Sequence, residues 1–216
     1  MHRIGVFDSG IGGMSVAQAI QVELPDAEVL LTNDPDHFPY AQKQPKELLS
    51  YVLPILDGLV DQGCEVIIIA CNTVSTTLIK DLRERIKVPL IAMEPMVKPA
   101  AETTKSKVIA VCATPTTLAS KRYADLKEEF ADGIKVIEPD CSDWSYMIET
   151  KQVDKEKVKS IVEEVCNSGA DVVVLACTHY HWIEDIITDG VAGRAKILQP
   201  EAPVIAQLKR VLKIET

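Results

Sequence analysis

The chain has 216 residues, of which 47% are apolar and 25% charged, and it carries a formal net charge of −9 at pH 7. This acidic balance argues against nucleic acid as a partner, since nucleic-acid binding needs a basic surface. No apolar run is long enough to cross a membrane, and the N-terminus lacks the apolar stretch of a signal peptide. We therefore expect a cytoplasmic globular protein that contacts no membrane.

Short apolar runs that predict strands alternate with amphipathic stretches that predict helices. In chain order the predicted strands are Ile4–Asp8, Val29–Thr32, Val66–Ala70, Leu90–Ala92, Val108–Cys112, Lys135–Ile137, Val172–Ala176 and Lys196–Leu198. The clearest helices are Pro45–Gln62 and Asp154–Asn167, and Pro54 is expected to kink or split the first of them. A final helix, about Ala202–Leu212, is expected to pack back on the first half of the chain.

Strand and helix alternation predicts an α/β fold with parallel sheet. The chain also repeats itself, because QGCEVIIIACNT at Gln62–Thr73 aligns with SGADVVVLACTH at Ser168–His179. The repeat predicts two pseudo-symmetric parallel-sheet halves, each a flavodoxin-like sandwich, with the active site in the cleft between them. We expect the first half to comprise residues 1–95 with 203–216, and the second to comprise residues 96–202.

Each copy of the repeat ends in a cysteine, Cys71 or Cys177, where a parallel strand ends and ligands usually bind. A thiol acts as a base only as its thiolate, which is about 3% of an unperturbed cysteine at pH 7. Each cysteine begins a loop leading into a predicted helix, whose N-terminus favours an anion. Asp8 is suited to exchange a proton with Cys71, and His179 with Cys177. The pattern predicts two opposed acid–base cysteines around one small substrate.

Other chemistries fit the sequence less well. None of the six cysteines forms a C-x-x-C pair, and Cys64, Cys112 and Cys166 are interpreted as small buried apolar residues. The segment Cys177–His181 lacks a second pair of zinc ligands at any usual spacing, so no metal is expected. The loop DSGIGG at Asp8–Gly13 does not fit the G-x-G-x-x-G pattern, and its aspartate would repel a phosphate. Its glycines are interpreted as allowing a tight backbone turn against a ligand.

Five motifs in order resemble one known family, the aspartate/glutamate racemase superfamily, and most closely its glutamate racemases. The resemblance covers nearly the whole chain. Its motifs are IGVFDSGIGGMSV at the start, FPYAQK at Phe38–Lys43, ACNTVST at Ala70–Thr76, ATPTTLASKRY at Ala113–Tyr123 and ACTHY at Ala176–Tyr180.

The resemblance implies racemisation of glutamate without cofactor or metal, supplying D-glutamate for peptidoglycan. Cys71 would act on the D-enantiomer and Cys177 on the L-enantiomer, while Asp8 and His179 would assist proton transfer. A further family acid would fall on Glu149. The residues implied to hold the substrate are Ser9, Pro39, Tyr40, Ala41, Asn72, Thr73, Thr114, Thr117 and Thr178. By family analogy the protein would form a homodimer.

Several positions depart from the family pattern. Ala41 and Thr116 stand where glycine is usual, His181-Trp182 replaces Pro-Leu, and Asn33–His37 is unusual before the FPYAQK motif. The sequence therefore leaves open a racemase of aspartate or another acidic amino acid, and a binding or regulatory relative whose site has drifted. Single-cysteine relatives such as decarboxylases fit less well, because both cysteines are present.

Overall fold

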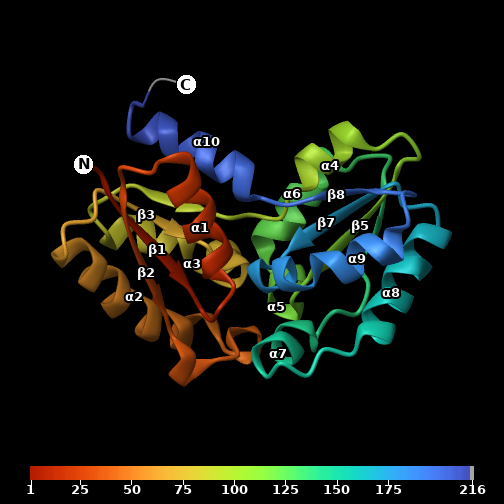
Figure 1. Cartoon of the computed structure of the whole chain (residues 1–216), viewed down its shortest axis with the longest axis horizontal. Coiled ribbons are helices and arrows are strands. Elements are labelled where there is room, and N and C mark those ends of the chain that lie inside the picture. Colours follow the sequence, from red (N-terminus) through yellow and green to blue (C-terminus); the bar gives the residue numbers. More distant parts are fainter. Residues whose placement is uncertain (215–216) are drawn as a thin grey trace. The chain divides into compact units, whose positions relative to one another are not determined.

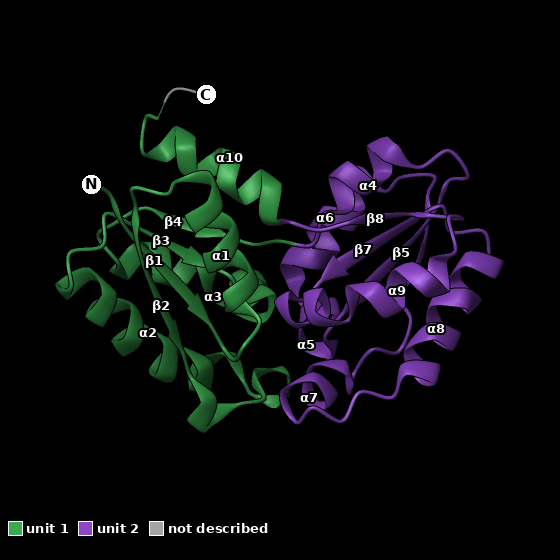
Figure 2. Ribbon diagram, viewed as in Figure 1, with its two compact units in different colours: residues 1–94, 201–216 green, residues 95–200 purple. Residues whose placement is uncertain are grey.

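The computed structural model describes residues 1–214 and divides into two compact units (Figure 2). Unit 1 comprises residues 1–94 and the C-terminal segment that begins at Glu201, and unit 2 comprises residues 95–200. No helix in the described residues is long and apolar enough to cross a membrane.

Unit 1 is a four-stranded parallel sheet with strand order β2-β1-β3-β4, flanked by helices (Figure 1). Its strands are β1 (Arg3–Asp8), β2 (Glu28–Asn33), β3 (Val66–Ile69) and β4 (Leu90–Ala92). Its helices are α1 (Gly13–Glu23), α2 (Pro45–Asp61), α3 (Asn72–Arg85) and α10 (Glu201–Val211), with short 3₁₀ turns η1 (Pro35–His37) and η2 (Tyr40–Gln42).

Unit 2 repeats this topology, with strand order β6-β5-β7-β8 and parallel pairing throughout. Its strands are β5 (Val108–Ala113), β6 (Lys135–Ile137), β7 (Val172–Ala176) and β8 (Lys196–Leu198). Its helices are α4 (Val97–Thr103), α5 (Pro115–Leu118), α6 (Lys121–Phe130), α7 (Trp144–Glu149), α8 (Lys155–Asn167) and α9 (Glu184–Val191), with the 3₁₀ turn η3 (Thr178–Ile183). The predicted α/β fold with two parallel-sheet halves is confirmed.

Both faces of each central strand are covered by helices, which explains the unbroken apolar runs in the sequence. Every residue of β3 and of β7 is buried. In unit 1, Ile67 and Ile69 face a core shared with α2 and α3, whereas Val66 and Ile68 face a second core on the opposite side of the sheet. This second core includes residues of α1 and α10, so the last helix of the chain packs on the first sheet.

The sequence predicts that Pro54 kinks or splits helix α2; the helix runs without interruption through Pro54, so the expected split is wrong. Pro54 lies on the exposed side, where the carbonyl group left without an N–H partner can be hydrated. Buried residues precede and follow it, among them Val52 and Leu56, and they hold both parts of α2 against the same core.

Each copy of the repeat has an acidic residue directly before its strand, Glu65 or Asp171, and this residue holds the amino end of the sheet through hydrogen bonds. In unit 1 the Glu65 carboxylate accepts a hydrogen bond from the backbone N–H of Arg3. In unit 2 the Asp171 carboxylate accepts hydrogen bonds from the Thr104 hydroxyl and from the backbone N–H groups of Lys105 and Ser106. Partial burial alone would raise the pKa of Asp171, but these hydrogen bonds outweigh it and lower the pKa to about 2.

Candidate active site

The order of strands in each sheet indicates where a ligand binds. In an open α/β sheet, ligands bind beyond the carboxyl ends of the strands, at the point where the strand order reverses. This reversal point lies between β1 and β3 in unit 1 and between β5 and β7 in unit 2. Asp8 ends β1 and Cys71 follows β3, whereas Ala113 ends β5 and Cys177 follows β7. Both sequence-predicted cysteines therefore lie at these two equivalent positions.

In unit 1 the thiol of Cys71 lies beside a hydroxyl group and a helix N-terminus. The parallel register pairs Phe7 with Ile69, so the residues two positions further along lie side by side. Accordingly, Ser9 Oγ is 3.4 Å from Cys71 Sγ, within hydrogen-bonding distance for sulfur. Cys71 is also the N-cap of the 14-residue helix α3, whose positive end favours a negative charge on the sulfur.

The Asn72 side chain is the most informative polar group of this site. It is only 3% exposed, yet neither its Oδ1 nor its Nδ2 atom has a hydrogen-bond partner within residues 1–214. Leaving a buried polar group unsatisfied costs about 1–3 kcal/mol, so such a group calls for a further partner, such as a ligand or an ordered water. The orphaned amide is therefore suited to bind a small polar molecule next to Cys71.

Close packing of α1 against β1 holds the fully buried Asp8 in place. A Cβ atom added at Gly13 would lie 2.7 Å from Asp8 Cβ and 3.1 Å from a methyl carbon of Leu31. Neither Gly12 nor Gly13 needs a left-handed backbone, since both have ordinary helical or cap geometry. The glycine at position 13 thus allows a close approach to Asp8, rather than the tight turn against a ligand that the sequence suggested.

In unit 2 an imidazole links the thiol to a carboxylate. Cys177 Sγ is 3.8 Å from His179 Nδ1, and His179 Nε2 is 2.8 Å from Glu149 Oε1. The His179 side chain is 3% exposed and that of Glu149 is 18% exposed, so the pair is largely shielded from water. The arrangement can move a proton to or from the sulfur while the carboxylate stabilises the charged imidazolium.

The segment after Cys177 is a six-residue 3₁₀ turn, η3, which leads into helix α9. Its buried Tyr180 donates a hydrogen bond to the Cys141 carbonyl group at 3.1 Å and packs edge-on against Trp144, with ring centres 5.1 Å apart. These contacts hold η3 against α7, the helix that ends at Glu149. Because η3 is short, a helix dipole contributes less here than at Cys71, and the His179–Glu149 pair matters more.

The other four cysteines, Cys64, Cys112, Cys141 and Cys166, are also buried. Burial raises the pKa of the Cys64 and Cys166 thiols. Burial also raises the pKa of the Cys141 thiol far above its usual range, and the neighbouring Cys112 thiol raises it further. The raised pKa values keep the Cys64 and Cys166 thiols protonated at neutral pH, which makes them suitable controls for experiments on the two cysteines of the candidate site.

The remaining predicted substrate-binding residues fall into two sets. Ser9, Pro39, Tyr40, Ala41, Asn72 and Thr73 belong to unit 1, and Thr114, Thr117 and Thr178 belong to unit 2. Tyr40 packs in the same apolar core as Cys71. Thr114 caps α5 by accepting a hydrogen bond from the Thr117 backbone N–H, and it donates its hydroxyl to Thr117 Oγ1 at 3.0 Å. These two hydroxyl groups thus have a structural role whether or not they bind substrate.

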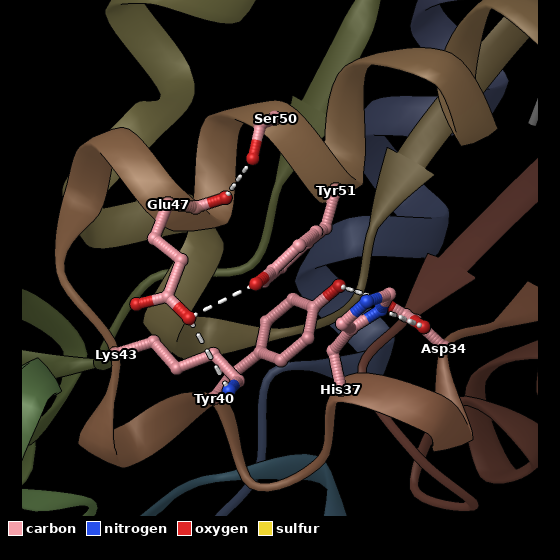
Figure 3. Close-up of polar contacts among 7 residues, drawn as sticks. All are labelled: Asp34, His37, Tyr40, Lys43, Glu47, Ser50 and Tyr51. Carbon is pink, nitrogen blue, oxygen red and sulfur yellow. Dashed lines mark hydrogen bonds and ion pairs between the residues drawn. The ribbon is translucent and has the colours of Figure 1, made fainter.

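Sequence reasoning missed a polar cluster that adjoins the FPYAQK motif (Figure 3). Its centre is the buried Asp34 carboxylate, which accepts hydrogen bonds from His37 and Tyr40. An acid two positions after the predicted strand Val29–Thr32, followed three residues later by a histidine, is the signal that could have revealed it.

Comparisons with known proteins identify the family to which the chain belongs. Residues 14–206 match the model of the Asp/Glu/Hydantoin racemase family. A glutamate racemase of Ralstonia pickettii (strain 12J) is 37% identical over 213 residues, which are 97% of this chain and 76% of the relative.

Two crystal structures with bound glutamate are also similar. Escherichia coli glutamate racemase in complex with L-glutamate and the activator UDP-MurNAc-ala has 26% identity and a TM-score of 0.91, covering 100% of this chain and 84% of that one. Francisella tularensis glutamate racemase in complex with D-glutamate has 28% identity and a TM-score of 0.81, covering 98% of this chain and 81% of that one.

The fold and the named relatives of the chain identify this protein as an isomerase of the racemase class. The chain belongs to the Asp/Glu/hydantoin racemase family. The family resemblance predicted from the motifs is confirmed.

The contact between Gly13 and Asp8 predicts that Gly13→Ala destabilises the protein by about 1–3 kcal/mol, because the added methyl group overpacks the start of α1. The matched control is Gly58→Ala, since nothing lies within 4 Å of a Cβ atom added at Gly58 inside α2. This control should be neutral or more stable by about 1 kcal/mol. Urea unfolding measures both, and equal stability of the two variants would contradict the packing argument.

Proposed function

We propose that this protein interconverts L- and D-glutamate by a two-base proton transfer that needs no cofactor. The observation that carries the proposal is the placement of one cysteine at each of two equivalent strand-order reversals, each with its own proton-handling groups. The choice of glutamate is supported by the printed names of the relatives, which include structures with L-glutamate and with D-glutamate bound.

Racemisation requires one group to remove the α-proton and another to deliver a proton to the opposite face. Starting from D-glutamate, the Cys71 thiolate takes the α-proton, and the bonding electron pair stays on the α-carbon and its carboxylate. The Cys177 thiol then donates its proton to the other face, which forms L-glutamate and leaves a thiolate on Cys177. The reverse reaction starts from that thiolate, so the two cysteines exchange roles in the two directions.

Each thiol needs a partner that manages its charge. For Cys71 the partners are the Ser9 hydroxyl, the N-terminus of α3 and Asp8. For Cys177 the partner is His179, which Glu149 orients and stabilises through its hydrogen bond to Nε2. The two sets are chemically different, so we expect them to tune the two thiols by different means.

Donors must offset the extra negative charge that develops on the substrate carboxylate when the α-proton leaves. The net charge of −9 makes local donors more important, because the overall field repels an acidic substrate. The buried Asn72 amide is the best supported of these donors. We assign the same task to Thr73 and Thr178 and to the backbone of Pro39–Ala41.

We further propose that the D-glutamate formed supplies peptidoglycan synthesis in the cytoplasm and that the enzyme works as a homodimer.

A substrate panel with the two enantiomers of glutamate, aspartate and other acidic amino acids tests the substrate. Faster racemisation of another amino acid would replace glutamate with that substrate, and binding without turnover would favour a regulatory relative.

Replacing either Cys71 or Cys177 by alanine should lower glutamate racemisation at least ~10²-fold, because one face of the α-carbon loses its acid or base. The loss of optical rotation of a solution of L-glutamate measures the rate. The matched controls are Cys64→Ala in unit 1 and Cys166→Ala in unit 2, both buried thiols away from the strand-order reversals. An active Cys71 or Cys177 variant, or controls that lose as much activity, would refute the two-base assignment.

Replacing Glu149 by glutamine should lower kcat/KM about tenfold or more, since His179 loses the carboxylate that stabilises its charged form. The loss should be equal for L- and D-glutamate, because enantiomers have equal free energies and the ratio of the two kcat/KM values cannot change. Glu156→Gln, an exposed carboxyl group at the start of α8, is the control. Wild-type kinetics in the Glu149 variant would remove this residue from the mechanism.

A further inference from the structure

A buried carboxylate stands at the end of the edge strand next to Asp8. The parallel register pairs Asp8 with Asn33, so Asp34 leaves the sheet immediately beyond the end of β1. The Asp34 side chain is 7% exposed. It accepts a hydrogen bond from the Tyr40 hydroxyl at 2.6 Å and a bifurcated one from His37 Nδ1, which lies 2.8 and 2.9 Å from its two oxygens. A carboxylate this deeply buried depends on such partners, because each lost one leaves a desolvated charge.

His37 joins this carboxylate to helix α2. Its ring stacks on Tyr51, with ring centres 3.7 Å apart and planes inclined by 15° (Figure 3). Tyr51 is itself held within α2, because its hydroxyl donates to Glu47 Oε1 at 3.0 Å and Lys43 Nζ lies 5.7 Å from its ring centre. The imidazole is therefore fixed on one side by the sheet and on the other by the helix.

Tyr40 connects the same carboxylate to the candidate site. The Tyr40 ring is buried in the core that contains Phe7 and Cys71. Burial raises the pKa of Tyr40 far above its usual range, and the hydrogen bond to Asp34 and the charges of Asp34, Cys71 and Asp8 raise it further. Tyr40 thus stays protonated as a donor to Asp34 and lies within electrostatic reach of the catalytic pair proposed for unit 1.

We propose that Asp34, His37 and the Tyr40 hydroxyl form a positioning network that sets the backbone of Pro39–Ala41 for substrate binding. The inference rests on the proposed function, which gives that backbone its substrate contact. The network acts through the loop and not on the α-proton. Its loss should therefore weaken substrate binding more than it slows proton transfer.

The test is a comparison of His37→Ala with His37→Asn. Alanine removes the donor to Asp34, whereas the Asn side-chain amide can place an N–H group close to the position of Nδ1. We expect His37→Ala to raise KM for glutamate about tenfold with kcat within about threefold of wild type. We expect His37→Asn to restore KM to within about twofold of wild type.

His2→Ala is the matched control. His2 is also in unit 1, its Nδ1 is 3.1 Å from the Glu65 carboxylate, and its side chain is 40% exposed, against 41% for His37. It precedes β1 and therefore lies at the opposite end of the sheet from Asp34. Its removal should leave KM and kcat as in wild type.

Hydrogen exchange of the backbone amides of residues 36–43, measured without substrate, separates failure of this inference from failure of the proposed function. His37→Ala should speed exchange in this segment, and His37→Asn and His2→Ala should not. If His37→Ala speeds exchange in residues 36–43 but the wild-type protein does not racemise glutamate, the proposed network is supported and glutamate is rejected as the substrate. Unchanged exchange and unchanged KM in His37→Ala, or a fall in kcat alone, would overturn the inference.

Discussion

The parallel pairing of β1 with β3, repeated in β5 with β7, is the constraint on which the site depends. Parallel strands end at the same edge of a sheet, so the residues that follow paired strands lie side by side. In unit 1 this brings Ser9 to within 3.4 Å of the Cys71 sulfur. In unit 2 the register of Ala113 with Ala176 gives Thr114 the corresponding position next to Cys177. A one-residue change in either register would turn these side chains to the other face of the sheet.

The two units share this frame but differ in the groups that surround each thiol. The counterpart of Asp8 in unit 2 is Ala113, since both stand opposite the alanine that precedes the cysteine. Unit 2 therefore has no carboxyl group at this position, and its acid comes from Glu149 through His179. The helix after the cysteine also differs, because α3 has 14 residues and η3 only six. The proposed two-base racemisation needs each thiol in both protonation states, and the two units offer different chemical means for this.

Much of the fold could be predicted from the sequence, because buried parallel strands such as Val66–Ile69 leave short β-branched apolar runs that alternate with helical patterns. The repeat revealed Cys71 and Cys177, since both follow such runs. What could not be predicted depends on distances between remote segments. The approach of Gly13 to Asp8, the orphaned amide of Asn72 and the cluster around Asp34 are visible only once the helices and turns are placed on the sheet. Pro54 does not split α2 for a related reason, because core packing on both sides outweighs one missing hydrogen bond.

The central claim, that two different groups serve the two faces of the α-carbon, is tested most directly by racemisation in deuterium oxide. L-Glutamate is incubated with the enzyme for less than one-tenth of the approach to equilibrium, and both enantiomers are analysed for α-deuterium by mass spectrometry. The account predicts deuterium in the D-glutamate formed and almost none in the L-glutamate recovered, because the thiol that donates differs from the thiolate that abstracts. Equal deuterium in both enantiomers would contradict it, because a single base would then return a solvent-exchanged proton to either face.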